Sequence, residues 1–428
     1  MKTIRIIPSK SDAHRAYIAT ALSGADFSHV VCDETSEDIE ATKRCLAAML
    51  SGDENLYCGE SGSTLRFLLP VVGALGIRGV FRPEGRLIDR PLSPLKEELC
   101  SHGMSVSVLN DSITAEGNLL SGIYRIPGNI SSQFISGLLF ALPLLDGDSE
   151  IIVEGELESS PYVDMTVETL GRFGVEVDDE TDMSFSGSDF IQSRTFRIKG
   201  NQKYKAPDKY VVEGDWSNAA FWLTMGAIGD EPIRVEGLRI GSMQGDERVL
   251  DALDVFGVRF EVGEDRKSRI EGSNCYVEAY PSKERMQGII WDASETPDMV
   301  PAVALMGAFA KGETRIVNAG RLRLKESDRL RTVAETLAAL GVKADELEDG
   351  LAIGGLNLDG TPGTMLNEAT LQSFGDHRIA MMAAAASVSM AGTNRTIKLE
   401  GYDSVRKSYP AFFDIMKELE LDSNLKLI

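Results

Sequence analysis

The sequence predicts an α/β protein with mixed sheets and two domains, each made of three strand-helix-strand-helix-strand-strand (βαβαββ) repeats packed around buried helices. Two series of recurring segments predict this fold. In the first series, a strand-like run passes into a helix-like run six times, at residues 31, 81, 153, 235, 317 and 399. The last three intervals are 82 residues each and the first is 50, so one supersecondary unit has been copied and its first copy is shortened.

The second series consists of apolar helices whose first turns are unusually polar. The segment 220–229 (AFWLTMGAIG), for example, is hydrophobic nearly all round, which is typical of a buried helix. Polar starts of this kind occur once in each copy, at 9–15, 60–66, 131–134, 215–218, 296–299 and 376–378. We therefore expect buried helices at the centre of each domain and sheets on the outside.

Glycines mark the ends of the other helices. Glycine enters the left-handed region without strain, so a glycine after a periodic apolar run predicts a helix end. A strand-like run follows such a glycine in four copies, at Gly103, Gly174, Gly257 and Gly341. Loops rich in Asp, Asn, Glu and Gly then lead to the last strand of the copy.

The segment 198–210 (IKGNQKYKAPDKY) is polar and unpatterned, which predicts a domain boundary near Val212. The expected domains are 9–212, and 1–8 together with 213–428. If the copies in a domain run in the same direction, their buried helices present their N-termini at one end. Each N-terminus carries unsatisfied amide donors and about half a positive charge, which attract anions. The active site is therefore expected in the cleft between the domains.

Composition and charge exclude several function classes. A formal net charge of −22 in 428 residues argues against nucleic acid or an acidic membrane surface as a partner. The longest apolar runs, 138–145 and 302–310, fall well short of the ~18 residues that span a bilayer. The first residues read as a strand and lack the features of a signal peptide. Five cysteines without a CxxC pair predict reduced thiols, no metal site and a cytoplasmic location.

Cations gather at equivalent positions of the repeats although the chain as a whole is acidic. A single Lys or Arg is better explained as part of a solvated surface, whereas the whole set indicates binding of phosphate and carboxylate groups. Ser131, Ser132 and Gln133, at one helix start, form a further candidate phosphate site. The cations are Lys10, Arg15, Arg66, Arg86, Arg90, Arg321, Arg323, Lys325, Arg329, Arg378, Arg406 and Lys407.

Two acids have two interpretations each. Asp298 lies in the first turn of a helix and, taken alone, favours a capping role. Glu326, between Lys325 and Arg329, is either half of a surface ion pair or a carboxylate that transfers protons. His377 is expected to make a structural hydrogen bond. No Walker loop, GxSxG, GxGxxG or zinc pattern is present.

Eleven motifs, spread over nearly the whole chain, resemble the enolpyruvyl transferase family, and the serine-rich and SxPYxD motifs resemble its members that act on shikimate 3-phosphate. One such motif is weak, but eleven in the family's order are specific. They are SKSxxxR at 9, SGSTxR at 61, RxxxRP at 86, SSQF at 131, SxPYxD at 159, EGDxSxA at 213, QGD at 244, PDMVP at 297, LKESDR at 324, DHR at 376 and KSYPxFF at 407.

The resemblance implies an activity. The enolpyruvyl (1-carboxyvinyl) group of phosphoenolpyruvate would pass to the 5-hydroxyl of shikimate 3-phosphate, through a tetrahedral intermediate and with release of phosphate. This is a transferase reaction of the shikimate pathway to chorismate and the aromatic amino acids. The resemblance implies no metal and no organic cofactor, and we expect a monomer whose partners are these two substrates, without nucleic acid or membrane.

The resemblance also implies roles for residues at matching positions. Asp298 would take the 5-hydroxyl proton, Glu326 would protonate the methylene carbon, and Lys10 and Lys407 would stabilise charge on the carboxylate and the departing phosphate. The shikimate 3-phosphate residues would be Lys10, Ser11, Arg15, Ser131, Ser132, Gln133, Ser159, Tyr162, Asp298 and Lys325. The phosphoenolpyruvate residues would be Lys10, Gly62, Arg90, Gln133, Arg329, Arg378 and Lys407.

Several positions depart from the family pattern, and alternatives remain open. A glycine is missing between Pro8 and Ser9, and the segment 12–14 (DAH) replaces small residues and Asn. Glu60 and Arg321 each stand where the family has Asn, and Phe67 stands where it has Pro. One alternative is transfer to UDP-N-acetylglucosamine, but the loop 85–94 lacks the cysteine usual in that enzyme. The others are a catalytically silent anion-binding scaffold and an RNA-end-processing relative, which the acidic charge disfavours.

Overall fold

The computed structural model describes residues 1–186, 189–264, 274–356 and 365–428. The chain forms two compact units. One unit is Lys10–Val212, and the other combines Met1–Ser9 with Glu213–Ile428. Each unit has its own hydrophobic core of buried side chains.

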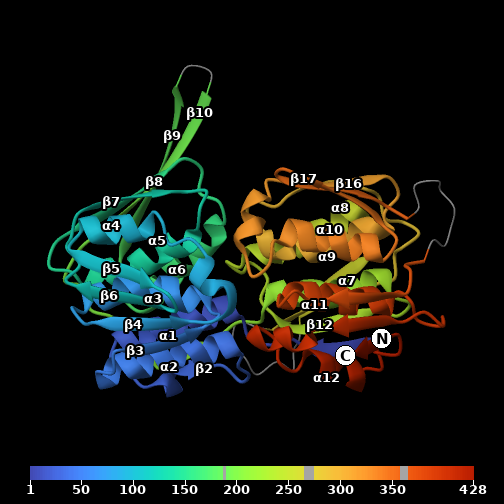
Figure 1. Ribbon diagram of the computed structural model, residues 1–428, viewed down its shortest axis with the longest axis horizontal. Helices are drawn as coiled ribbons and strands as arrows, with labels where there is room; N and C mark the ends of the chain where they lie inside the picture. The colour runs from blue at the N-terminus through green and yellow to red at the C-terminus, as the bar shows by residue number, and fades with distance from the viewer. Residues whose placement is uncertain (187–188, 265–273, 357–364) are drawn as a thin grey trace. The chain divides into compact units, whose positions relative to one another are not determined.

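Four copies of the repeat share one strand order. In each copy the first strand runs parallel to the second, the fourth pairs antiparallel with the second, and the third lies at the edge. The unit Lys10–Val212 holds two of these copies (Figure 1). The earlier copy is β3 (Asn55–Gly59), α3 (Gly62–Ala74), β4 (Gly79–Pro83), α4 (Leu95–Ser101), β5 (Met104–Leu109) and β6 (Ser112–Gly117). The later copy is β7 (Ile123–Pro127), α5 (Ser132–Ala141), β8 (Ser149–Glu154), α6 (Ser160–Arg172), β9 (Val177–Ser186) and β10 (Asp189–Ile198).

The other unit holds the remaining two copies with this order. Their sheets run β1-β12-β14-β13 and β15-β16-β18-β17. The elements of the first are β1 (Lys2–Arg5), α7 (Trp216–Ile228), β12 (Ile233–Leu238), α8 (Val249–Phe256), β13 (Phe260–Glu264) and β14 (Cys275–Ala279). Those of the second are β15 (Ile290–Asp292), α9 (Val300–Phe309), β16 (Glu313–Val317), α10 (Arg329–Ala339), β17 (Lys343–Leu347) and β18 (Gly350–Gly354).

The first and last copies are shorter. The first has only a two-stranded sheet, as its short sequence interval predicted. The sixth copy also departs from the full pattern, because β21 lies parallel to β20 where the other copies add an antiparallel pair. The first copy comprises α1 (Lys10–Leu22), β2 (Val30–Val31), α2 (Glu37–Ser51) and β11 (Tyr210–Val211). The sixth comprises β19 (Ala369–Gln372), α11 (His377–Val388), β20 (Ile397–Glu400), α12 (Phe412–Glu418) and β21 (Leu425–Leu427).

Two strands complete sheets far from their neighbours in sequence. β1 pairs in parallel with β12, with Ile4 opposite Val235. β11 pairs in parallel with β2, with Tyr210 opposite Val30. Each unit therefore takes the first strand of one copy from a distant segment of the chain.

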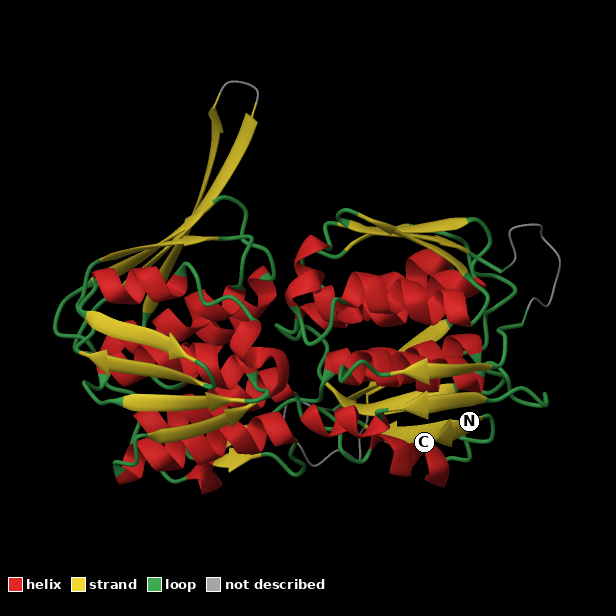
Figure 2. Cartoon of the chain, in the orientation of Figure 1, coloured by secondary structure: helices red, strands yellow, loops and turns green. Residues whose placement is uncertain are grey.

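The apolar helices form the cores, as the sequence predicted. Every residue of α7, α9 and α11 is buried, and these three helices contribute much of the core of their unit. In the other unit, α1, α3 and α5 supply the equivalent buried helices. Figure 2 shows helices inside and strands outside in each unit. Each of these helices begins where a polar start was predicted.

Short 3₁₀ helices occupy the turn between the second strand and the second helix in four copies. Three of these turns, η2, η6 and η7, carry several of the predicted cations. They are η2 (Gly85–Asp89), η4 (Gly245–Arg248), η6 (Gly320–Leu324) and η7 (Tyr402–Lys407). The other 3₁₀ helices are η1 (Phe27–His29), η3 (Leu142–Leu144) and η5 (Pro297–Met299).

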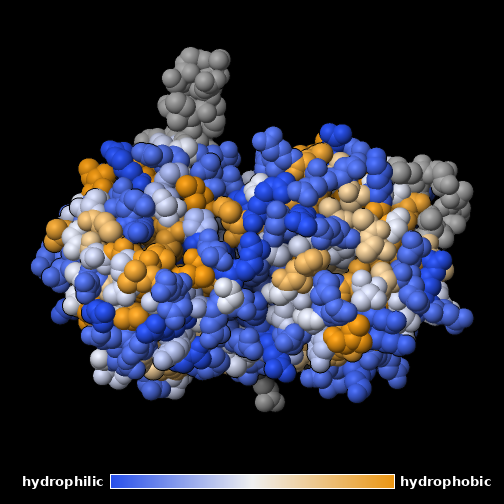
Figure 3. Space-filling model, in the orientation of Figure 1, coloured by the Kyte–Doolittle hydropathy of each residue, from blue (hydrophilic) through white to orange (hydrophobic). Residues whose placement is uncertain are grey.

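The face drawn in Figure 3 is predominantly hydrophilic, with hydrophobic residues in scattered small groups. Such scattered groups are normal on a protein surface. Across the described ranges, no helix is both long enough and apolar enough to cross a membrane.

We predict that Gly137→Ala destabilises the protein. A Cβ at Gly137, on α5, would lie 2.4 Å from the backbone oxygen of Arg66 on α3. Because this neighbour is backbone, the two helices must move apart, and overpacking of this kind costs about 1–3 kcal/mol. Gly171→Ala is the matched control, since a Cβ on that α6 residue meets nothing within 4 Å. If urea unfolding gives both variants the same free energy of unfolding, this account of the packing is contradicted.

Candidate active site

A buried arginine organises the candidate site in the unit that contains residues 213–428. Arg329 is the first residue of α10, and only 1% of its side chain is exposed. Its Nη1 donates to Asp298 Oδ1 at 2.6 Å, its Nη2 to Glu326 Oε2 at 2.8 Å and its Nε to Asp376 Oδ2 at 2.8 Å. These three carboxylates raise the pKa of Arg329 well above its ordinary value, although burial alone lowers it. Arg329 therefore holds both acids proposed for proton transfer.

Two further predicted cations face Asp298. Arg378 Nη2 donates to Asp298 Oδ2 at 3.1 Å, and Lys325 Nζ lies 3.6 Å from Asp298 Oδ1. Burial is the main cause that lowers the pKa of Lys325 to about 8; Arg329 also lowers it, and Asp298 acts in the opposite direction. Asp298 is thus the meeting point of three cations, and the N-cap residue of η5 is Thr296.

Two donors of Arg378 have no acceptor among the described protein atoms. Its side chain is 4% exposed, and within the described part of the chain its Nε and Nη1 have no hydrogen-bond acceptor. Buried donors of this kind are costly unless a ligand or water pairs with them. An arginine with two available donors suits a carboxylate or phosphate group.

The N-cap of α11 joins this cluster to Lys407. Asp376 caps α11 by accepting from the backbone amide of Arg378 at 2.9 Å, and it also accepts from the Ser327 hydroxyl at 3.0 Å. Lys407 Nζ donates to the carbonyl of Gly375, the residue before the cap, at 2.6 Å. The structure therefore brings together Asp298, Lys325, Glu326, Arg329, Arg378 and Lys407, all the residues predicted for the site in this unit.

A fourth acid, Asp246 on η4, lies fully buried in the same unit. Ser217, on the first turn of α7, donates to its carboxylate. Burial is the largest cause that raises the pKa of Asp246 to about 6, and Asp298 adds to it, whereas Arg378 and Ser217 act in the opposite direction. A carboxyl group with this pKa changes its protonation under mild conditions.

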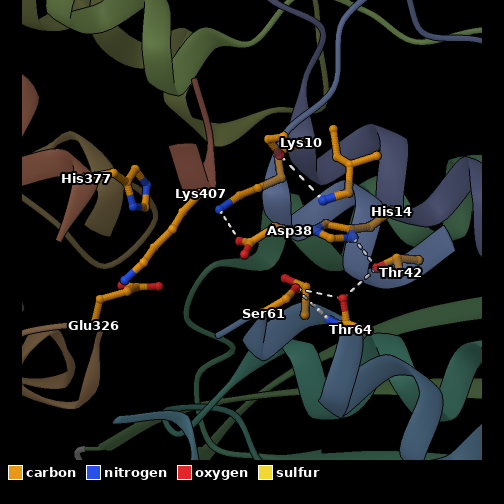
Figure 4. Close-up of polar contacts among 12 residues, drawn as sticks. Lys10, His14, Asp38, Thr42, Ser61, Thr64, Glu326, His377 and Lys407 are labelled. Carbon is orange, nitrogen blue, oxygen red and sulfur yellow. Dashed lines mark hydrogen bonds and ion pairs between the residues drawn. The ribbon is translucent and has the colours of Figure 1, made fainter. Parts of the chain in front are cut away.

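In the unit Lys10–Val212, a lysine pairs with an acid across two helices. Lys10 is the first residue of α1, and its Nζ lies 2.9 Å from Asp38 Oδ2 on the first turn of α2 (Figure 4). Both side chains are about 15% exposed, at 16% and 14%. The pairing directs the Lys10 ammonium group from α1 toward the first turn of α2.

Arg15 fastens α1 to α6. Its Nη1 donates to the carbonyl of Ser11 at 2.6 Å, its Nη2 to the carbonyl of Tyr162 at 2.5 Å, and its Nε to the Thr166 hydroxyl at 2.8 Å. Burial lowers the pKa of Arg15 to about 10, so it stays charged at neutral pH. Ser11, Arg15 and Tyr162 are thus brought together as predicted.

Two arginines lie over the N-terminus of α3. A Cβ added at Gly62 would lie 2.7 Å from Arg66 Nη1 and 3.0 Å from Arg90 Nη1, so a larger residue here would displace these guanidinium groups. Arg66 Nη1 donates to Gln133 Oε1 at 3.0 Å, and Gln133 Nε2 donates to Ser63 at 2.9 Å. Gly62, Arg90 and Gln133 therefore meet, as the sequence predicted.

Ser131, Ser132 and Ser159 lie where α5 and α6 begin. Ser131 is the N-cap residue of α5 and Ser132 its first residue. Ser159, before α6, has a left-handed backbone with φ of 55°, an uncommon conformation for serine that is often found at functional sites. The amide of Glu158 donates to the carbonyl of Gly128 at 3.1 Å, which holds together the loops that precede these two helices.

Three residues that contact the predicted site residues were not predicted themselves. Asp376 stood within a recognised motif, and its position at a buried helix start could have identified it. Asp246 lies in the QGD motif, but its burial is a tertiary property. Asp38 resembles an ordinary helix-start acid until its pairing with Lys10 is seen. Among the described residues, no group of three or more His, Cys, Asp or Glu is arranged to hold a metal ion.

The family model described as "EPSP synthase (3-phosphoshikimate 1-carboxyvinyltransferase)" matches residues 35–416. The chain belongs to the EPSP synthase family. A relative of that family from Clostridium kluyveri, a 3-phosphoshikimate 1-carboxyvinyltransferase, is 41% identical over 97% of this chain and 94% of its own length. A relative of the same name from Clostridium acetobutylicum is 39% identical, with the same coverage. The resemblance inferred from the eleven motifs is confirmed.

Solved structures show the same fold. EPSP synthase from Acinetobacter baumannii superposes with a TM-score of 0.72 at 23% identity, covering 97% of this chain and 95% of its own. The enolpyruvyl transferase NikO from Streptomyces tendae has a TM-score of 0.69 at 18% identity, covering 98% and 95%. The predicted enolpyruvyl transferase fold is confirmed.

We predict that Asp246 makes stability depend on pH. Its pKa is about 6 in the folded chain and near 3.9 when unfolded, so the folded state binds the extra proton between these values. The stabilisation is present below pH ~4 and is lost as the pH rises through 6, by about 3 kcal/mol at most. Asp246→Asn should flatten this part of the urea-unfolding profile. The exposed Asp251→Asn is the control, and an unchanged slope in Asp246→Asn would contradict the burial argument.

Proposed function

We propose that this protein transfers the enolpyruvyl group of phosphoenolpyruvate to the 5-hydroxyl of shikimate 3-phosphate and releases phosphate. Membership of the EPSP synthase family, with a model match over residues 35–416, supports this activity. The observation that carries the residue assignment is the single guanidinium of Arg329, which holds Asp298 and Glu326 at 2.6 and 2.8 Å. Addition of an alcohol to an enol ether needs one group to take a proton and another to give one, and two neighbouring carboxyl groups supply both.

The addition step moves two protons. Asp298 takes the proton of the 5-hydroxyl as its oxygen bonds to C2 of phosphoenolpyruvate, and Glu326 gives a proton to C3. The resulting tetrahedral intermediate then returns a C3 proton to Glu326, and its C2–O bond to phosphate breaks as the leaving phosphate takes the proton held by Asp298, which restores the double bond. Both acids thereby return to their starting states, with Glu326 protonated and Asp298 ionised.

Cations bind the anionic donor. The two available donors of Arg378, together with Arg329, suit the phosphoenolpyruvate carboxylate or phosphate. Lys407 Nζ donates to the carbonyl of Gly375, the residue before the N-cap of α11. Lys407 would stabilise charge on the departing phosphate. Preformed cations of this kind stabilise developing charge without reorganising.

The unit Lys10–Val212 supplies the shikimate 3-phosphate residues in this proposal. Ser131, Ser132 and Gln133 stand at the N-terminus of α5, where amide donors and the helix dipole favour a phosphate. Ser11, Arg15, Ser159 and Tyr162 form the neighbouring group, with Lys10, Gly62 and Arg90 on the phosphoenolpyruvate side.

We further propose that the protein works as a cytoplasmic monomer without a metal or organic cofactor. The five free cysteines support a reducing compartment. Size-exclusion chromatography with light scattering tests the monomer, and full activity after chelation tests the independence from metal.

Phosphate release tests the activity and its residues. With phosphoenolpyruvate and shikimate 3-phosphate, we expect turnover that falls by a factor of order 10² or more in each of Lys10→Ala, Asp298→Asn and Glu326→Gln. Glu335→Gln is the matched control, because Glu335 lies on α10 but pairs with the exposed Arg331. Turnover only with UDP-N-acetylglucosamine, or with neither acceptor, would overturn the proposal.

We predict an alkaline limit set by Lys325. Since its pKa is about 8, the ammonium group proposed to bind a ring hydroxyl loses its charge as the pH rises through that value. The kcat/KM for shikimate 3-phosphate should therefore decline above pH 8. In Lys325→Arg the guanidinium stays charged, and the decline should move beyond pH ~10. The same profile in both proteins would show that another group sets the limit.

A further inference from the structure

A row of buried polar side chains connects the three helices that begin the unit Lys10–Val212. His14 Nδ1 lies 2.7 Å from the Thr42 hydroxyl, which lies 2.6 Å from the Thr64 hydroxyl, which in turn donates to Ser61 at 2.7 Å (Figure 4). These residues stand on α1, α2, α3 and the N-cap of α3. All four side chains are fully buried.

The hydrogen bonds of this row are all donated in the same direction, from His14 toward Ser61. Each hydroxyl has one proton to donate. The Ser61 oxygen accepts from both the backbone amide and the hydroxyl of Thr64. Thr64 has thereby used its proton, so it accepts from Thr42, and Thr42 in turn accepts from the imidazole. His14 therefore carries a hydrogen on Nδ1.

The other ring nitrogen carries no hydrogen. Within the described residues, His14 Nε2 has no hydrogen-bond partner, and a protonated Nε2 would leave a buried donor unpaired. Burial, reinforced by the charges of Lys10 and Arg15, lowers the pKa of His14 well below its ordinary value. The imidazole is thus neutral, with its hydrogen on the nitrogen that faces α2.

The contact of His14 with Thr42 runs beside the Lys10 ion pair. Lys10 and His14 are four residues apart on α1, as Asp38 and Thr42 are on α2. Residues four apart lie one above the other on the same face of a helix. The two helices therefore meet through two successive cross-links, a partly exposed ion pair and a buried neutral bond. The second cross-link continues to α3, whose N-terminus holds Gly62.

We propose that His14, as the neutral Nδ1–H tautomer, is a positioning residue for enolpyruvyl transfer. The row that it begins fixes the first turns of α1, α2 and α3 against one another, and so fixes Lys10 and Gly62, which touch phosphoenolpyruvate in the proposed function. This inference rests on that proposed function for its consequence, but the tautomer stands on geometry alone.

Nitrogen-15 NMR of the full chain tests the tautomer directly. The chain has four histidines, and the His14 signals are those absent from His14→Asn. We expect a protonated Nδ1 and an unprotonated Nε2 that do not change between pH 5.5 and 8, the range about the ordinary histidine pKa of ~6.5. A hydrogen on Nε2, or an imidazolium signal in this range, would overturn the inference.

Kinetics test the positioning role. His14→Leu and Thr42→Val each break the row without adding charge, and each should raise the KM for phosphoenolpyruvate and lower kcat/KM by about tenfold or more, the size of effect that ~1.4 kcal/mol produces. The double variant should be no worse than either single variant, because both interrupt one row. The amide of His14→Asn can donate where Nδ1 does, so it should recover most of the loss.

The outcomes separate this inference from the proposed function. A wild-type chain without turnover would overturn the proposed function, and the NMR result would still decide the tautomer. An active wild type with unchanged KM and kcat in folded His14→Leu and Thr42→Val would overturn the positioning role. Thermal melting shows whether either variant unfolds. If one does, the kcat/KM of His14→Asn decides the positioning role: a value near that of the wild type supports the role, and a loss as large as that of Lys10→Ala contradicts it.

Discussion

The cost of burying charge governs the unit that contains Arg329. A guanidinium with 1% exposure is unfavourable unless carboxylates surround it, and removal of one partner leaves an uncompensated charge. Asp298, Glu326 and Asp376 come from a 3₁₀ turn, a loop and a helix cap, so three segments of the chain must converge for this one side chain to be stable. The same convergence places two acids side by side. Stability and reactivity here have a single origin.

The unit Lys10–Val212 solves the equivalent problem mostly with neutral groups. Its central helices also begin with polar residues inside a hydrophobic core, but hydroxyls and an imidazole satisfy one another there. Neutral partners avoid the desolvation penalty of ions, and hydrogen bonds between them are stronger in a low-dielectric interior than in water. Lys10 keeps 16% of its side chain exposed, whereas the buried Arg15 and Arg66 donate to carbonyl and amide oxygens.

The repeat pattern predicted the helices, strands and polar helix starts of the fold, because the period and the turn residues are local properties. α7, α9 and α11 were foreseen as buried from their apolar composition alone. The strand order of the sixth copy was not foreseen. β21 lies parallel to β20, and no local feature of its sequence distinguishes it from the edge strands of the other copies. Asp298 shows the same limit in the site, since its position favours capping and only tertiary contacts with Arg329 and Arg378 reveal its pairing.

The exchanged strands β1 and β11 affect how the protein can be divided. A recombinant half that starts at Glu213 would lack β1 and would leave the edge of β12 open, and open parallel edges promote aggregation. The amide of Ser9 lies 2.7 Å from the carbonyl of Glu213, so the first nine residues end beside the point where this half begins. A gene that joins the codon of Ser9 directly to that of Glu213 would encode this unit complete, with β1 included.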